Sequence, residues 1–232
     1  MGCIARARLS RRVRARAAAE GGFTLVELLT AMVILLIVLT SLTSVLVSAS
    51  RAEVDANRRF QAQEQARSGL DMLRHELHCA SSVTDTSGNS LTAGTAYSAI
   101  TATLGYQCPT TGGAISSGTM YVTWCTSTTG ASTAGDYALY RVTSTTVTRP
   151  TCSSAGTVKW MDYLQPTVVV PVSASTPFCL PSTTAACDGV FKATTSLPML
   201  HVTFPVNLNG PTSTIDSYKL VDDIALRNGA RS

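Results

Sequence analysis

Residues 23–49 form one almost uninterrupted apolar run, and this run limits what the chain can fold into more than any other feature. Its only ionisable side chain is Glu27. An α-helix rises about 1.5 Å per residue, so the run is long enough to cross the roughly 30 Å hydrocarbon core of a bilayer. We therefore predict a membrane helix over residues 23–49 with a single carboxylate near its start.

The carboxylate of Glu27 needs a partner in such a helix. Insertion of an ionised side chain at mid-bilayer costs about 2.5–3.5 kcal/mol, and a position near one end of the helix lowers that cost without removing it. An acid within a membrane segment is a functional hypothesis by default. The partner that we infer for Glu27 is an amine.

Residues 1–22 precede the apolar run and have the composition of a basic cytoplasmic leader. Six arginines stand against Glu20 alone: Arg6, Arg8, Arg11, Arg12, Arg14 and Arg16. The basic stretch ends at Gly22, before the apolar run, whereas a secretory signal peptide is cleaved after its apolar core. Positive charge stays on the cytoplasmic side, so we expect the residues beyond about Ser50 to face outward.

Removal of this leader changes the charge of the chain. Without it, 12 of the 18 basic and 13 of the 14 acidic residues remain, and the formal net charge falls from +4 to −1. The basic character therefore belongs to a targeting segment and is no footprint of nucleic-acid binding.

The start of the apolar run, Gly22-Phe23-Thr24-Leu25-Val26-Glu27, resembles the class III signal of type IV prepilins and type II secretion pseudopilins. The resemblance implies that a prepilin peptidase cuts after Gly22 and methylates the new N-terminus at Phe23. It also implies that Glu27 pairs with the N-terminal amine of a neighbouring subunit. Four residues of helix span about 6 Å, an axial offset that staggered parallel helices match. The alternative is an ordinary signal anchor that carries these residues by chance.

The helix is expected to continue as an amphipathic stalk over residues 50–80. Apolar residues recur there at spacings of three and four and form one stripe: Ala62, Ala66, Leu70, Leu73 and Leu77. No proline precedes Pro109, so we predict one helix from Phe23 to about Cys79.

The run at residues 66–77 is similar to the stalk of larger minor pilins of the W type and minor pseudopilins of the J type. The absence of a proline within the apolar helix and the 210 residues left after cleavage differ from many main pilus subunits. Both features favour a minor, initiating or tip-proximal subunit.

Residues 81–232 predict a β-rich extracytoplasmic head. Ser and Thr make up about a third of this region, and short β-branched and aromatic runs alternate with glycine and proline. We predict strands at residues 99–105, 119–126, 137–143, 146–149, 157–161, 168–172, 199–204 and 218–226. The predicted fold class is α+β, with a long N-terminal helix packed on a β-rich, disulfide-containing head.

Six cysteines follow the leader: Cys79, Cys108, Cys125, Cys152, Cys179 and Cys187. All six fall in the region expected outside the membrane, where an even number of cysteines indicates disulfides. The sequence leaves their connectivity open. Cys179 and Cys187 are closest in sequence and are the pair that we expect first.

The competing metal sites are weaker than the disulfides. His75, Glu76, His78 and Cys79 form the one compact cluster with zinc-ligand spacing, since His75 and Cys79 stand four residues apart on a helix. A second alternative is calcium at Asp222 and Asp223, but one adjacent pair supplies too few of the six to eight oxygens that Ca²⁺ prefers. We therefore predict no metal and no cofactor.

No catalytic constellation is evident. His201 is the only histidine of the head, and it acts as a nucleophile's base only if a hydroxyl and an acid converge on it. We therefore expect that the protein is not an enzyme. The alternative, a membrane-anchored surface enzyme, requires a pocket around His201.

The resemblance implies a minor type IV pilin or pseudopilin, a structural subunit of the cytoplasmic membrane that is later built into a filament. Its partners would be the prepilin peptidase, other pilins or pseudopilins, an inner-membrane assembly platform and the lipid bilayer. The alternative is a head that acts as an adhesin or binds DNA during uptake. The nearby cations Arg141, Arg149 and Lys159 are a weak phosphate site because phosphate contacts need clustered charge.

Overall fold

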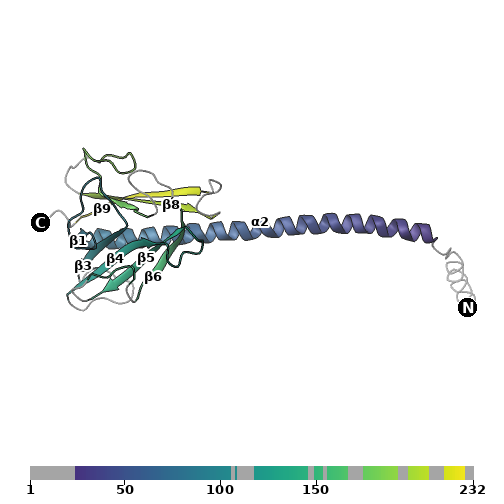
Figure 1. Ribbon diagram of the computed structural model, residues 1–232, viewed down its shortest axis with the longest axis horizontal. Coiled ribbons are helices and arrows are strands. Elements are labelled where there is room, and N and C mark those ends of the chain that lie inside the picture. The colour runs from purple at the N-terminus through teal and green to yellow at the C-terminus, as the bar shows by residue number, and fades with distance from the viewer. Residues whose placement is uncertain are drawn as a thin grey trace, which may run out of the picture. The chain divides into compact units, whose positions relative to one another are not determined.

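The computed structural model describes residues 24–105, 108, 118–145, 149–153, 156–166, 175–192, 198–208 and 217–227. The chain divides into two units, Met1–Asp55 and Ala56–Ser232. The helix α2 (Leu25–Cys79) contributes residues to both units (Figure 1). The predicted leader and most of two predicted strands, at residues 146–149 and 168–172, lie outside the described residues.

The first unit consists, in its described part, of the N-terminal portion of α2. Every residue of α2 up to Asp55 is exposed, and the large apolar side chains lie on all sides of the helix. Among the described residues, α2 is the one helix long and apolar enough to span a membrane by length and composition. Such a helix is stable in lipid because its backbone hydrogen bonds are all internal.

In the second unit the remainder of α2 buries one stripe against the sheet. All five positions of the predicted apolar stripe are buried, together with Gly69 and Glu76. A Cβ atom at Gly69 would lie 3.5 Å from the end of the Met161 side chain, so the absence of a side chain lets the helix approach β6 closely. The predicted stripe is confirmed, and Gly69 adds a close approach to it.

Within the described residues the second unit contains one nine-stranded sheet. Its strands are β1 (Ala80–Thr84), β2 (Ala96–Tyr97), β3 (Ala99–Gly105), β4 (Thr119–Ser127), β5 (Tyr137–Ser144), β6 (Val158–Leu164), β7 (Phe178–Cys179), β8 (Met199–Asn207) and β9 (Ser217–Ala225). Neighbouring strands are antiparallel and follow the order β1-β3-β4-β5-β6-β8-β7-β2, while β9 pairs with β8. The predicted α+β class is therefore confirmed.

Six predicted strands coincide with β3, β4, β5, β6, β8 and β9 to within a few residues. The sequence did not indicate β1, β2 or β7. Two of these are only two residues long, and β1 begins at Ala80, directly after the helix ends. Their pairing depends on neighbours far away in the sequence.

The sheet lies on two sides of the C-terminal part of α2. Figure 1 shows β8 and β9 on one side of this part of the helix and β3 to β6 on the other. The core between them contains Leu73 and Leu77 of the helix with Trp124, Phe178 and Phe204 of the strands, all fully buried. The helix thus acts as the central element of the second unit.

Three disulfides connect the second unit. They join Cys79 to Cys108, Cys125 to Cys152, and Cys179 to Cys187. The last is the local pair expected first from the sequence. The first ties the end of α2 to the segment that follows β3.

Candidate functional site

Thr24 and Glu27 form the N-terminal cap of α2. The backbone N–H of Glu27 donates to the Thr24 hydroxyl oxygen at 3.3 Å, and the Thr24 hydroxyl lies 3.5 Å from the Glu27 carboxylate. The N–H of Leu28 donates to the Thr24 carbonyl at 3.1 Å. Thr24 and Glu27 have the Thr-x-x-Glu spacing of a capping box, and the Thr24 hydroxyl supplies its N-cap hydrogen bond. The role of Thr24 was missed in the sequence, although its spacing to Glu27 would have indicated it.

Glu27 is exposed on the first turn of the helix. The positive end of the helix dipole stabilises a negative charge there by about 0.3–1 kcal/mol, less than the roughly 2.5–3.5 kcal/mol cost of placing an ionised side chain in the bilayer. Along the described helix, Arg51 is the next cationic side chain after Glu27, and 24 residues of helix separate them by about 36 Å. The Thr24 hydroxyl caps the backbone of the helix beside this carboxylate. No cationic side chain on the described helix is close enough to neutralise its charge.

The predicted cleavage and methylation positions, Gly22 and Phe23, lie outside the described residues. Processing at these positions remains a prediction. The described helix begins at Leu25, two residues after the predicted new N-terminus.

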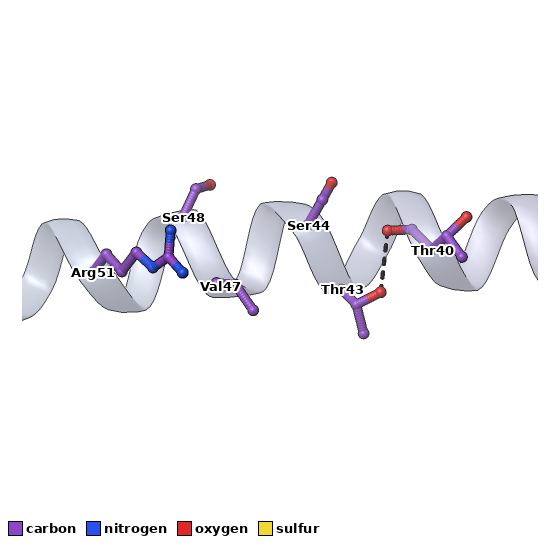
Figure 2. A pocket seen from close by; sticks show the side chains of 6 residues that line it. All are labelled: Thr40, Thr43, Ser44, Val47, Ser48 and Arg51. Atoms are coloured by element: carbon purple, nitrogen blue, oxygen red, sulfur yellow. Dashed lines mark hydrogen bonds between the residues drawn. The ribbon is translucent and has the colours of Figure 1, made fainter.

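A shallow pocket lies on one face of the helix in the first unit. It is lined by Thr40, Thr43, Ser44, Val47, Ser48 and Arg51 (Figure 2). The hydroxyl of Thr43 donates to the Thr40 carbonyl at 3.0 Å, and that of Ser44 donates to the Ser41 carbonyl at 2.8 Å. Thr40 and Ser48 also donate to carbonyls of the preceding turn. Because each of these four hydroxyls has a partner on its own helix, none of them is an unsatisfied donor in lipid.

In the second unit, a buried carboxylate joins the helix to the sheet. Glu76 is fully buried and accepts hydrogen bonds from Trp124 Nε1 at 2.7 Å and from Arg141 Nε and Nη2 at 2.9 and 2.5 Å. Arg141 is itself only 6% exposed. No local pattern predicted this network, because its members lie 48 and 65 residues from Glu76 in the sequence.

A second ion pair fixes the opposite side of the helix. Arg74 donates from Nε and Nη2 to the Asp222 carboxylate of β9 at 2.9 and 2.8 Å. Residues 74 and 76 point about 200° apart around a helix. The two pairs therefore hold α2 to β9 on one side and to β4 and β5 on the other.

His201 lies in a buried polar cluster on β8. Its Nδ1 lies 2.8 Å from the Asp223 carboxylate, and its Nε2 lies 3.2 Å from the Thr203 hydroxyl. Burial alone would raise the pKa of Asp223, but hydrogen bonds from Lys192 and His201 hold it below its usual value. Asp223 is therefore an anion that can only accept hydrogen bonds, so Nδ1 of His201 is the donor in this pair.

A hydroxyl and an acid do converge on this histidine, as a nucleophilic site requires. Thr203 and His201 are, however, each only 1% exposed. A substrate cannot reach a hydroxyl that is buried to this extent. We therefore interpret the cluster as an internal polar network. The absence of catalysis remains a prediction.

The structure separates the residues considered as metal ligands. Cys79 is oxidised in a disulfide and is no thiolate ligand, while Glu76 points into the core. Asp222 and Asp223 pair with different partners, because consecutive residues of a strand point to opposite faces. Among the described residues, no group of three or more His, Cys, Asp or Glu side chains has the arrangement of a metal site.

The three cations considered for DNA binding do not form an exposed cluster. Arg141 is buried on Glu76. Arg149 lies over the Tyr121 ring, 5.4 Å from its centroid, and Lys159 pairs with Asp162 at 2.7 Å. Since phosphate contacts need clustered, accessible cations, the geometry does not favour this alternative.

Comparison with known proteins bears on the N-terminal site. The family model described as the prokaryotic N-terminal methylation motif matches residues 18–43. No curated protein and no solved structure matches the chain. The matched segment contains Gly22, Phe23 and Glu27 and extends through the apolar helix, so the candidate site lies within a prepilin-type N-terminal motif.

Proposed function

We propose that this chain is a minor type IV pilin or pseudopilin, a structural subunit that initiates or caps a membrane-derived filament. The match to the methylation motif supports the broader class, a pilin-like or pseudopilin-like subunit that a prepilin peptidase processes and that assembles with other pilins. The minor position and the kind of filament, for pilus assembly, protein secretion or DNA uptake, are our proposal.

The observation that carries the proposal is Glu27. This carboxylate lies exposed on the first turn of a helix that carries no other charge as far as Arg51. The methylated amine of Phe23 on a neighbouring subunit is a cation of the right sign and position. Pairing would neutralise two charges that are each costly in lipid, and an unpaired buried charge costs several kcal/mol.

Two properties of the chain support a minor position. Removal of 22 of the 232 residues leaves a mature chain of 210, and α2 runs from Leu25 to Cys79 without a proline. The second unit carries three disulfides, which are stable in an oxidising compartment. We propose that this unit faces outward from the cytoplasmic membrane and that an inner-membrane assembly platform extracts the subunit from the bilayer.

The proposal is tested by the mass of the N-terminus. We expect the chain isolated from membranes of cells with a prepilin peptidase to begin at methylated Phe23, and the chain from cells without the peptidase to retain residues 1–22. Gly22→Ala should leave the leader attached, while the adjacent Gly21→Ala should be processed normally. A leader retained in the presence of the peptidase, or a Phe23 N-terminus in the Gly22→Ala variant, would contradict the assignment.

A further inference from the structure

Asp136 ends the loop between β4 and β5, residues 128–136. The residue is fully buried, and neither carboxylate oxygen meets the geometry of a hydrogen bond. An ionised carboxylate without a well-formed hydrogen bond is strongly disfavoured in a protein interior, and the Thr133 side chain offsets only part of the effect of burial here. Asp136 therefore requires a proton, a cation or a route to water.

The negative charge of the neighbouring Asp162 makes ionisation of Asp136 still less favourable. The pairing of Tyr137 with Leu164 places Asp136 beside the C-terminal end of β6, which also carries Asp162. Asp162 is 4% exposed and is itself a fixed anion. Burial would raise its pKa, but hydrogen bonds from Lys159 and Ser132 hold that pKa below its usual range.

Asp162 has no acceptor capacity left for a shared cation. One oxygen accepts the backbone N–H groups of Ser132 and Tyr163 at 3.1 and 2.9 Å. The other accepts the Ser132 hydroxyl at 2.5 Å and the Lys159 ammonium at 2.7 Å. A carboxylate offers about four lone-pair sites, and four donors occupy them here. This favours a proton as the species that neutralises Asp136.

The other titratable groups near Asp162 have hydrogen-bond partners or positions of their own on β5 and β6. Lys159 on β6 bridges Asp162 and the Gly130 carbonyl, the latter at 3.1 Å. Tyr140 on β5 donates to the Thr129 carbonyl at 2.6 Å. Tyr163 lies directly after Asp162 on β6. The Thr133 side chain is near enough to offset part of the effect of burial on Asp136.

The same contacts hold the loop closed. Ser132 docks on Asp162, Gly130 on Lys159 and Thr129 on Tyr140. The loop therefore rests against β5 and β6 through Asp162, the anion that neighbours Asp136. Ionisation of Asp136 would place two negative charges side by side, and movement of the loop would bring Asp136 to water.

We propose that the loop at residues 128–136 is a proton-operated latch: a proton on Asp136 keeps it closed on β6, and loss of that proton opens it. Burial first, and then the negative charge of Asp162, raise the pKa of Asp136 from 3.8 to about 6. The group is thus neutral in a mildly acidic medium and charged in a neutral one.

The sign and size of the effect follow from linkage. The closed loop binds the proton more tightly than the open loop, so closure is favoured at low pH and is lost as the pH rises through about 6. If opening returns Asp136 to its ordinary pKa, the equilibrium between open and closed loop shifts about tenfold between pH 5 and pH 7.5.

Hydrogen exchange of the full chain in detergent micelles, read by mass spectrometry, tests the latch. After correction for intrinsic exchange rates, peptides covering residues 128–136 should lose about tenfold protection between pH 5 and pH 7.5. Asp136→Asn keeps the shape but does not titrate, so its protection should be nearly the same at both pH values. Ser132→Ala should loosen the loop at both pH values and keep the tenfold ratio.

Three outcomes would overturn the latch. One is equal protection of the wild-type loop at both pH values, and another is an unchanged pH ratio in Asp136→Asn. The third is restored protection at pH 7.5 on addition of millimolar calcium chloride, which would make a cation the neutralising partner. If Asp136→Asn does not fold, Asp162→Asn replaces it, and the latch then predicts a looser loop with a smaller pH ratio.

Discussion

The two units of this chain satisfy their polar groups in opposite ways. Along α2 in the first unit, six serine and threonine hydroxyls bond to a carbonyl three or four residues earlier, as Thr43 does with Thr40; they belong to Thr30, Thr40, Ser41, Thr43, Ser44 and Ser48. In the second unit, Glu76 depends on Trp124 and Arg141, 48 and 65 residues away. Arg74 depends on Asp222, 148 residues away.

This difference fits the surroundings that we propose for the two units, lipid for the first and an aqueous compartment for the second. A helix that enters lipid meets no water, so its hydroxyls need partners on the same helix. The exception is Glu27, whose charge no group on the helix neutralises. A folded head outside the membrane can instead bury charges against distant strands, and these charges fix how the helix and the sheet pack. Loss of a partner should therefore be severe in the second unit and mild in the first.

The largest expected effect follows from breaking the buried ion pair. Arg141→Met leaves the Glu76 carboxylate buried with one remaining donor, and the free energy of unfolding should fall by about 3–5 kcal/mol. Urea unfolding of the full chain in detergent, followed by tryptophan fluorescence, measures it. The double variant Glu76→Leu with Arg141→Met should recover much of the loss. A loss below about 1 kcal/mol in the single variant would show that the pair is not an anchor.

Removal of disulfides should have the next largest effect and should depend on the loop that each bridge closes. The bridge from Cys79 to Cys108 spans 29 residues, and that from Cys179 to Cys187 spans 8. Chain entropy predicts losses of about 3.5 and about 2.5 kcal/mol when each pair is replaced by serine. The same urea titration measures both, and a larger loss from the short bridge would contradict the chain-entropy explanation.

A smaller effect is expected at the start of the helix. Thr24→Ala removes the hydroxyl that caps the Glu27 N–H and should cost about 1 kcal/mol, confined to the first turn. Hydrogen exchange at residues 25–28 measures it in detergent. Thr24→Ser retains the hydroxyl and serves as the control. Unchanged exchange in the alanine variant would show that the cap is not needed.

The smallest effect is expected on the hydroxyl face of Figure 2. Ser44→Ala removes a hydroxyl that donates to the carbonyl of Ser41 on the same helix. Since the backbone bonds of the helix persist, stability in detergent should change by less than about 0.5 kcal/mol. A loss above about 1 kcal/mol in circular-dichroism melting would reveal a partner that the isolated chain lacks.

The same contrast explains what the sequence predicts. The helix, its buried stripe and most long strands follow from local periodicity, and the match at residues 18–43 agrees with the motif at Gly22 to Glu27. The capping role of Thr24 was also readable from its spacing to Glu27. These features depend on residues within one or two turns of each other.

The rest depends on contacts that no local pattern encodes. Glu76 looked like a member of a histidine-rich metal cluster, yet it is buried on Arg141 of a strand. Asp136 is an ordinary loop acid in the sequence and becomes exceptional only when β5 and β6 bury it beside Asp162. The two-residue strands β2 and β7 likewise exist only through tertiary pairing.

The central claim is that the Glu27 carboxylate pairs with the processed N-terminus of a neighbouring subunit. The most direct test co-expresses Glu27→Val with the wild-type chain and measures the share of each in purified filaments against its share in membranes. The account predicts that the variant is cleaved normally and is strongly depleted from filaments. Thr30→Val, which removes only a hydroxyl bonded to the Glu27 carbonyl, should be incorporated normally. Equal incorporation of Glu27→Val and wild-type chains would contradict the account.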